Sequence, residues 1–146
     1  MLHRRKNRER GAAAVEFALV SMILLTIIGV TFQFAIYLWA FQAASNGARE
    51  GAREWAVNPC GTGQAAKVVT AVTPAARPGS VNATRVFRHE VTGTVITTGI
   101  QPGSQVTATV TMQARALGFN LVPGWNYNRT ITKTATARVE GNAGCP

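Results

Sequence analysis

The chain has 146 residues, so it can form one small domain with an additional segment. Its formal net charge is +9, but the densest group of basic residues lies within the first ten positions and the others are scattered. A nucleic-acid-binding domain concentrates basic and aromatic residues in its folded part. The charge pattern therefore argues against that class. A role in fixing the orientation of the chain across a membrane explains the basic cluster better.

Directly after this cluster comes a long apolar run, and no residue between Phe17 and Gly47 is charged. The segment 17–41 would be about 37 Å long as a helix, enough to cross a hydrocarbon core of about 30 Å. Basic residues stay on the cytoplasmic side, so we expect a single-pass protein of the cytoplasmic (inner) membrane. Its N-terminus would lie inside and its C-terminal domain outside.

A secretory signal peptide is the competing interpretation of this N-terminal region. Ala43-Ala44-Ser45 could be its cleavage site, and the domain after it would then be released. However, the apolar part of a signal peptide is only about 7–15 residues long. The run observed here is much longer, which disfavours this alternative.

Glu16 is an acidic residue at the start of the apolar run. Ionisable residues inside a membrane are functional candidates by default. Cleavage after Gly11 would create a new amino group on Ala12, about 6 Å before Glu16 along the helix axis. The carboxylate of one helix could pair with the Ala12 amine of a neighbouring helix. Such an ion pair would fix the register of the two helices more than it would stabilise their association. The alternative is that Glu16 lies at headgroup level and is only hydrated.

The helical pattern continues beyond the membrane to Val57 and ends at Asn58-Pro59, because the residue before a proline avoids helical geometry. We expect one long helix over residues 12–57. The tetrapeptide Gly47-Ala48-Arg49-Glu50 repeats at once in residues 51–54. Gly47 and Gly51 therefore share a helix face that permits close approach of another helix. The alternative is an alanine-rich linker helix without a packing role.

Residues 58–146 have the pattern of a small α+β domain outside the cytoplasm. A short helix is expected over residues 64–72, closed by Pro74. Apolar residues alternate with threonines over 106–114 and over 130–139, which predicts two half-buried strands, the second interrupted by Lys133. Weaker strand patterns cover 83–91 and 92–98. The expected fold class is α+β: a long transmembrane helix, a short helix and a small antiparallel sheet.

Cys60 and Cys145 are the two cysteines of the chain, and both fall on the predicted outer side. An even pair in an oxidising compartment favours one disulfide, and two unpaired thiols are the alternative. The sequence contains no aspartate, and His3 and His89 are far apart without clustered ligands. We therefore predict no catalytic residues, no metal site and no cofactor, and the protein is not expected to be an enzyme.

The residues around Gly11 carry a family resemblance. Gly11 followed by Ala-Ala-Ala-Val-Glu-Phe and an apolar helix is similar to the type IV prepilin class of signal. The longer string Arg-Gly-Ala-Ala-Ala-Val-Glu-Phe-Ala-Leu resembles the TadE-like family of minor pilins or pseudopilins of the tight-adherence (Flp) pilus. The similarity is close over residues 8–54 and loose over the threonine-rich strands.

The resemblance implies that a prepilin peptidase removes the basic leader 1–11, with Gly11, Ala12, Glu16 and Phe17 as the processing residues. It also implies a pilin-like fold and a role in pilus assembly. The partners would be other pilin or pseudopilin helices, which dock through Glu16, Gly47 and Gly51, and the membrane platform proteins of the tight-adherence system. The alternative is an uncleaved, membrane-anchored protein whose outer domain binds a partner or ligand.

Overall fold

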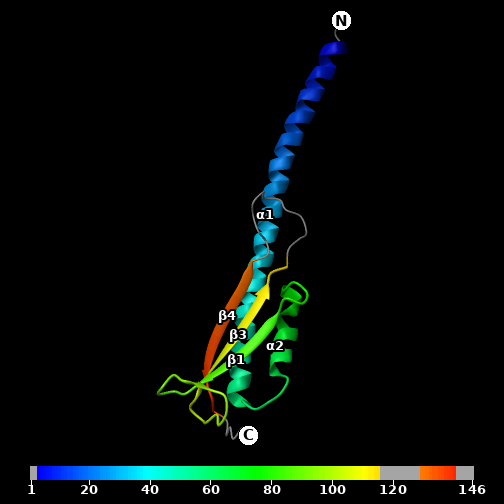
Figure 1. Ribbon diagram of the computed structural model, residues 1–146. Helices are drawn as coiled ribbons and strands as arrows, with labels where there is room; N and C mark the ends of the chain where they lie inside the picture. The colour runs from blue at the N-terminus through cyan, green and yellow to red at the C-terminus, as the bar shows by residue number, and fades with distance from the viewer. Residues whose placement is uncertain (1–2, 116–128, 141–146) are drawn as a thin grey trace.

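A computed structural model describes the backbone of residues 3–115 and 129–140, and side chains from Gly11 onward within these ranges. Its dominant element is α1 (His3–Val57), a single uninterrupted helix of 55 residues. Figure 1 shows its N-terminal half projecting away from the rest of the protein. The segment Gly11–Val57 is long and apolar enough to cross a membrane, and its most apolar window is not covered by other parts of the chain. The helix therefore fits single-pass membrane anchoring.

The helix α1 begins at His3, nine residues before the predicted start at Ala12. The leader contains mainly Arg, Lys and Glu, which are good helix formers, and no proline. One glycine at position 11 costs only about 1 kcal/mol within a helix. The helix therefore runs through the leader. The C-terminal boundary at Val57 agrees with the prediction.

The C-terminal half of α1 and the elements that pack on it form a domain with two layers, which we call the outer domain. Its sheet contains β1 (Asn82–Arg88), β2 (Val95–Ile96), β3 (Gln105–Gln113) and β4 (Thr130–Arg138), in the order β2-β1-β3-β4 with every pair antiparallel. The C-terminal half of α1 lies along β3 and β4, and α2 (Gln64–Val72) lies against α1 and β1, followed by the short 3₁₀ helix η1 (Thr73–Ala75). This arrangement confirms the predicted α+β class with an antiparallel sheet. The predicted connection 117–128 lies outside the described residues.

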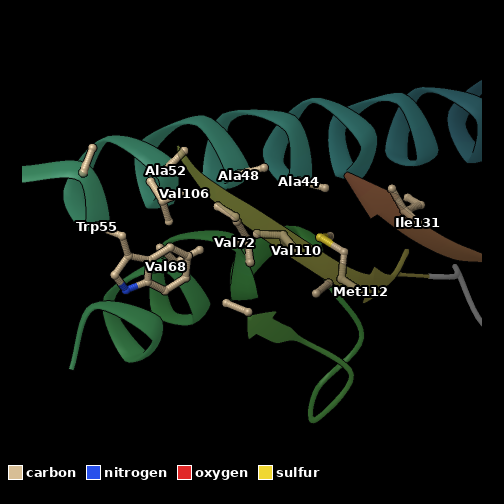
Figure 2. Close-up of a cluster of buried hydrophobic side chains, with 14 of the residues drawn as sticks. Ala44, Ala48, Ala52, Trp55, Val68, Val72, Val106, Val110, Met112 and Ile131 are labelled. Carbon is tan, nitrogen blue, oxygen red and sulfur yellow. The ribbon is translucent and has the colours of Figure 1, made fainter. Parts of the chain in front are cut away.

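The core lies between α1, α2 and the inner face of the sheet. On β3 every second residue is buried while the intervening threonines are half-exposed, as the alternation predicts. Small residues of α1 allow the helix axis to approach the sheet closely, and Trp55 fills the far end (Figure 2). The main contributors are Ala44, Ala48, Ala52 and Trp55 of α1, Val68 and Val72 of α2, Val106, Val110 and Met112 of β3, and Ile131 of β4.

Lys133 interrupts the apolar alternation of the last strand, as the sequence shows, but the strand itself is continuous. Lys133 pairs with Val110 within a continuous β4. Its ammonium group lies 3.4 Å from the centroid of the Phe41 ring on α1, a position in which a cation is attracted to the aromatic face. The aliphatic stem can therefore occupy the inner face of the sheet while the charged end remains at the margin of the domain.

Candidate functional site

The predicted processing residues lie together on one part of α1. The helix α1 carries all four of them within about two turns, and all four are exposed: Gly11, Ala12, Glu16 and Phe17. The Phe17 side chain is 74% exposed. No other part of the described chain packs on this segment. Its side chains are therefore free to meet lipid, an enzyme or another helix.

Gly11 has no packing reason to be glycine within this chain. A Cβ atom built at this position would meet nothing within 4 Å, whereas glycine inside a helix costs about 1 kcal/mol relative to alanine. The conformation of residue 11 is ordinary helix and needs no positive φ. A requirement for glycine at position 11 would therefore have to come from outside the folded chain.

The Glu16 carboxylate makes no ion pair or hydrogen bond with the described side chains. It lies on the same helix as Ala12, about 6 Å further along the axis. In the intact chain the Ala12 nitrogen belongs to a helical peptide bond and carries no charge. Only cleavage after Gly11 would turn that nitrogen into a cation.

Gly47 and Gly51 do have a packing reason within the chain. A Cβ atom on Gly47 would come within 2.5 Å of Val72 Cγ1 on α2, and one on Gly51 within 3.2 Å of Val68 Cγ2. The close approach that this glycine face permits is thus made by the chain's own α2 and β3. Docking of a neighbouring subunit at these two glycines stays a prediction, and it would require this intramolecular contact to open.

The far end of the domain contains a partly open cavity of about 450 Å³ beside the turn that follows α1. Arg85 of β1 lies in its wall, where it donates a hydrogen bond of 2.9 Å to the Pro59 carbonyl oxygen and contacts the rings of Trp55 and Phe87. Cys60 lines the same cavity. Cys145 lies outside the described residues, so its pairing with Cys60 stays a prediction.

The described residues contain no group of three or more His, Cys, Asp or Glu side chains that could hold a metal ion. His89 is exposed at the end of β1, and its Nδ1 accepts a hydrogen bond from the backbone of Val91. This imidazole therefore has a local structural role in the turn. The sequence pattern did not predict the contact of Lys133 with Phe41, although the inward position of Lys133 between Ile131 and Ala135 could have indicated it.

Comparison with known proteins gives one match. Residues 11–53 match the model of a family described as TadE-like protein. No curated protein and no solved structure matches the chain. The matched segment begins at the glycine of the candidate processing site, contains Glu16 and Phe17, and ends in the glycine repeat. The predicted resemblance is thus confirmed over the N-terminal helix, where residues 11–53 are similar to the TadE-like family.

Proposed function

We propose that the protein is a TadE-like minor pilin or pseudopilin of the tight-adherence pilus. A prepilin peptidase cleaves it after Gly11, and Glu16 then docks its helix to neighbouring subunits. The observation that supports the proposal is that the start of the family match, an unexplained glycine and an exposed carboxylate occur together at one end of α1. The family match begins at Gly11, a glycine that no contact within the chain requires, and Glu16 follows on the exposed helix.

The leader and the helix would have different roles before and after cleavage. The leader carries five basic residues beside the apolar run, and such residues hold the N-terminus on the cytoplasmic side of the inner membrane. Moving them through lipid is costly. Removing residues 1–11 takes this charge away, so the mature helix can shift along the membrane normal into an assembly with other pilin helices and platform proteins.

Cleavage would also create the partner of Glu16. The new Ala12 amine is a cation at a helix N-terminus, where the helix dipole favours a nearby carboxylate. A Glu16 from an adjacent subunit can supply that carboxylate, and the two charges then satisfy each other in a medium that solvates neither. Because the pair forms only at one relative height, it fixes the stagger between subunits.

The N-terminus of the mature protein tests the processing step. Mass spectrometry of the protein from its native membrane should give a chain that begins at Ala12. An intact Met1 would instead favour the uncleaved, membrane-anchored alternative, and a start near Asn46 would indicate a secretory signal peptide.

The Gly11→Ala variant should accumulate as the uncut precursor when a prepilin peptidase is co-expressed. Gly29→Ala, the same substitution elsewhere in the apolar run, is the control and should be processed normally. Because a Cβ atom at position 11 meets nothing in the folded chain, a loss of processing in Gly11→Ala reports on recognition and not on folding. Normal processing of this variant would overturn the cleavage assignment.

The Glu16→Val and Glu16→Gln variants test docking. Both should insert into the membrane, but cross-linking of their cleaved chains to other pilin helices should fall strongly, because neither side chain can pair with the Ala12 amine. Glu50→Val removes a carboxylate outside the apolar run and should keep wild-type cross-linking. If Glu16→Gln assembled like the wild type, the ion-pair role of Glu16 would be wrong.

A further inference from the structure

Four basic residues gather at the end of the outer domain that faces the membrane-spanning half of α1. We call them the basic rim: Arg77, Arg115, Arg129 and Lys133. The backbone nitrogen of Arg77 donates a hydrogen bond of 2.8 Å to the carbonyl oxygen of Gln113 at the end of β3. Gln113 pairs with Thr130, which puts Arg115 and Arg129 beside the same end of the sheet. Figure 1 shows the tip of β3 and the start of β4 directed toward the projecting half of α1.

The depth of the basic rim follows from its contact with α1. Lys133 lies on the ring of Phe41, the last residue of the apolar run. β4 runs in the same direction as α1 (Figure 1). Arg129, four residues earlier, is therefore about 13 Å nearer the membrane, a height that α1 covers in about nine residues. The rim thus extends from the level of Phe41 to about the level of residue 32.

The part of α1 that no other element covers defines where lipid can lie. Among the side chains of α1 that the structure describes, that of Gln33 is the first buried one from the N-terminus. The uncovered stretch 12–32 is about 31 Å long, which agrees with a hydrocarbon core of about 30 Å. The headgroup region adds about 5–7 Å on each side of that core. The end of the basic rim that Arg129 forms consequently lies at the level of the headgroups, and Lys133 lies about 6–8 Å beyond them.

The acidic residues of the outer domain lie away from the rim. Its four glutamates are at positions 50, 54, 90 and 140, and the nearest of them along α1, Glu50, is nine residues beyond Phe41. In the described part of the chain, the ion pairs join Glu50 to Arg53, Glu54 to Lys67 and Glu90 to Arg138. None of them includes a cation of the basic rim, so this charge is available for an external anion.

We propose that the basic rim binds the phosphate groups of anionic phospholipids in the leaflet from which α1 emerges, and that this contact holds the sheet upright against the membrane surface. Arginine presents several donors that match phosphate oxygens, and the Lys133 ammonium, which is further from the hydrocarbon core, still lies within a screening length of about 10 Å of the headgroups. Each such cation near an anionic surface strengthens binding about fivefold. The inference requires that α1 spans the membrane, but it does not depend on cleavage after Gly11 or on a role in a pilus.

Hydrogen exchange of the full-length chain in nanodiscs tests this contact. Nanodiscs of phosphatidylcholine alone are compared with nanodiscs that also contain phosphatidylglycerol. Peptides that cover residues 105–115 and 129–138 should exchange several-fold more slowly with phosphatidylglycerol. The effect should disappear at high salt, because the screening length falls from about 10 Å at 0.1 M to about 3 Å at 1 M.

Matched variants identify the residues responsible. Arg115→Gln with Arg129→Gln should reduce the equilibrium constant for docking about 25-fold, at about fivefold for each cation, and should remove the phosphatidylglycerol effect. Arg49→Gln with Arg88→Gln removes the same charge from exposed sites outside the rim and should preserve the effect. Equal exchange in both kinds of nanodisc, or an effect that survives in the rim variant, would overturn the proposal. So would equal protection by inorganic phosphate added to phosphatidylcholine nanodiscs, because that would indicate a site for free anions.

Discussion

At the scale of single residues, three glycines of α1 have two different explanations. Gly47 is required by a neighbour in the same chain, since Val72 of α2 occupies the space that a Cβ atom would need, and Gly51 is tightly packed by Val68 of α2 and by Trp55. Gly11 has open space around it. The first two glycines therefore belong to folding, and Gly11 is the glycine whose role we assign to recognition by another protein.

This distinction predicts the stability of alanine variants. Gly47→Ala should lower the free energy of unfolding by about 1–2 kcal/mol, because a collision with a stiff, buried valine outweighs the gain in helix propensity of about 1 kcal/mol. Gly51→Ala should stay within about 1 kcal/mol of the wild type, because its closest contacts are wider, at 3.2 Å. Chemical denaturation in detergent micelles measures both. A Gly47→Ala variant as stable as Gly51→Ala would contradict this ranking.

At the scale of elements, α1 serves two environments with one continuous backbone. Its N-terminal half exposes large apolar side chains such as Phe17, Leu25 and Phe32, as a lipid-facing helix does. Its C-terminal half buries alanines and Trp55 against the sheet. Because the helix is unbroken, a displacement of the membrane half is transmitted directly to the outer domain.

The contact between α1 and α2 includes an exposed ion pair, in which Lys67 Nζ lies 2.8 Å from Glu54 Oε1. The hydrogen bond from Lys67 lowers the pKa of Glu54 below 4.5, and the same bond raises the pKa of Lys67 above 10.5. The stabilisation is therefore present between these values. It is lost as the pH falls below 4.5 through the folded-state pKa of Glu54, and as the pH rises above 10.5 through that of Lys67.

We therefore expect the Lys67→Gln variant to have a flatter acid limb in its stability profile than the wild type. Denaturation followed by circular dichroism at several pH values below 4.5 measures this difference. The effect should be small and weakened by salt, because both groups are exposed. Arg49→Gln, which removes an exposed cation that takes part in none of the ion pairs of the described residues, is the control and should keep the wild-type acid limb. Identical acid limbs in Lys67→Gln and wild type would contradict the assigned ion pair.

At the scale of the whole molecule, the end of the chain returns to the end of α1. The backbone nitrogen of Glu140 donates a hydrogen bond of 3.2 Å to the carbonyl oxygen of Ala56. Cys60 follows Ala56 by four residues, and Cys145 follows Glu140 by five. An extended stretch of five residues reaches about 17 Å. This geometry supports the predicted disulfide, although Cys145 itself lies outside the described residues.

The predicted disulfide should stabilise the outer domain by about 4 kcal/mol in the chain-entropy model, because it closes a long loop. The double variant Cys60→Ser with Cys145→Ser should lose this amount under oxidising conditions. A reductant should bring the wild type to the same Tm and leave the double variant unchanged. A wild-type Tm that does not respond to the reductant would indicate that the two thiols are unpaired.

Several elements of this protein follow from local sequence patterns alone. The length of the apolar run predicted the spanning helix, Asn58-Pro59 predicted its end, and the regular alternation of β3 predicted a half-buried strand. These properties depend on local periodicity and on backbone sterics, which a sequence displays directly. The residues from Gly11 to Phe17 could likewise be found as a candidate site, because a carboxylate at the edge of an apolar run is unusual wherever the chain folds.

Which surfaces meet cannot be read from local patterns, because side-chain contacts depend on strand order and register, which join residues far apart in the chain. Strand order and register put Lys133 on Phe41, gathered Arg77, Arg115 and Arg129 at one end of the sheet, and covered the glycine repeat with α2. Local patterns could not show that Gly47 and Gly51 have an intramolecular role and that Gly11 does not. The difference depends on whether Val68 and Val72 lie beside the helix, and only the packed domain puts them there.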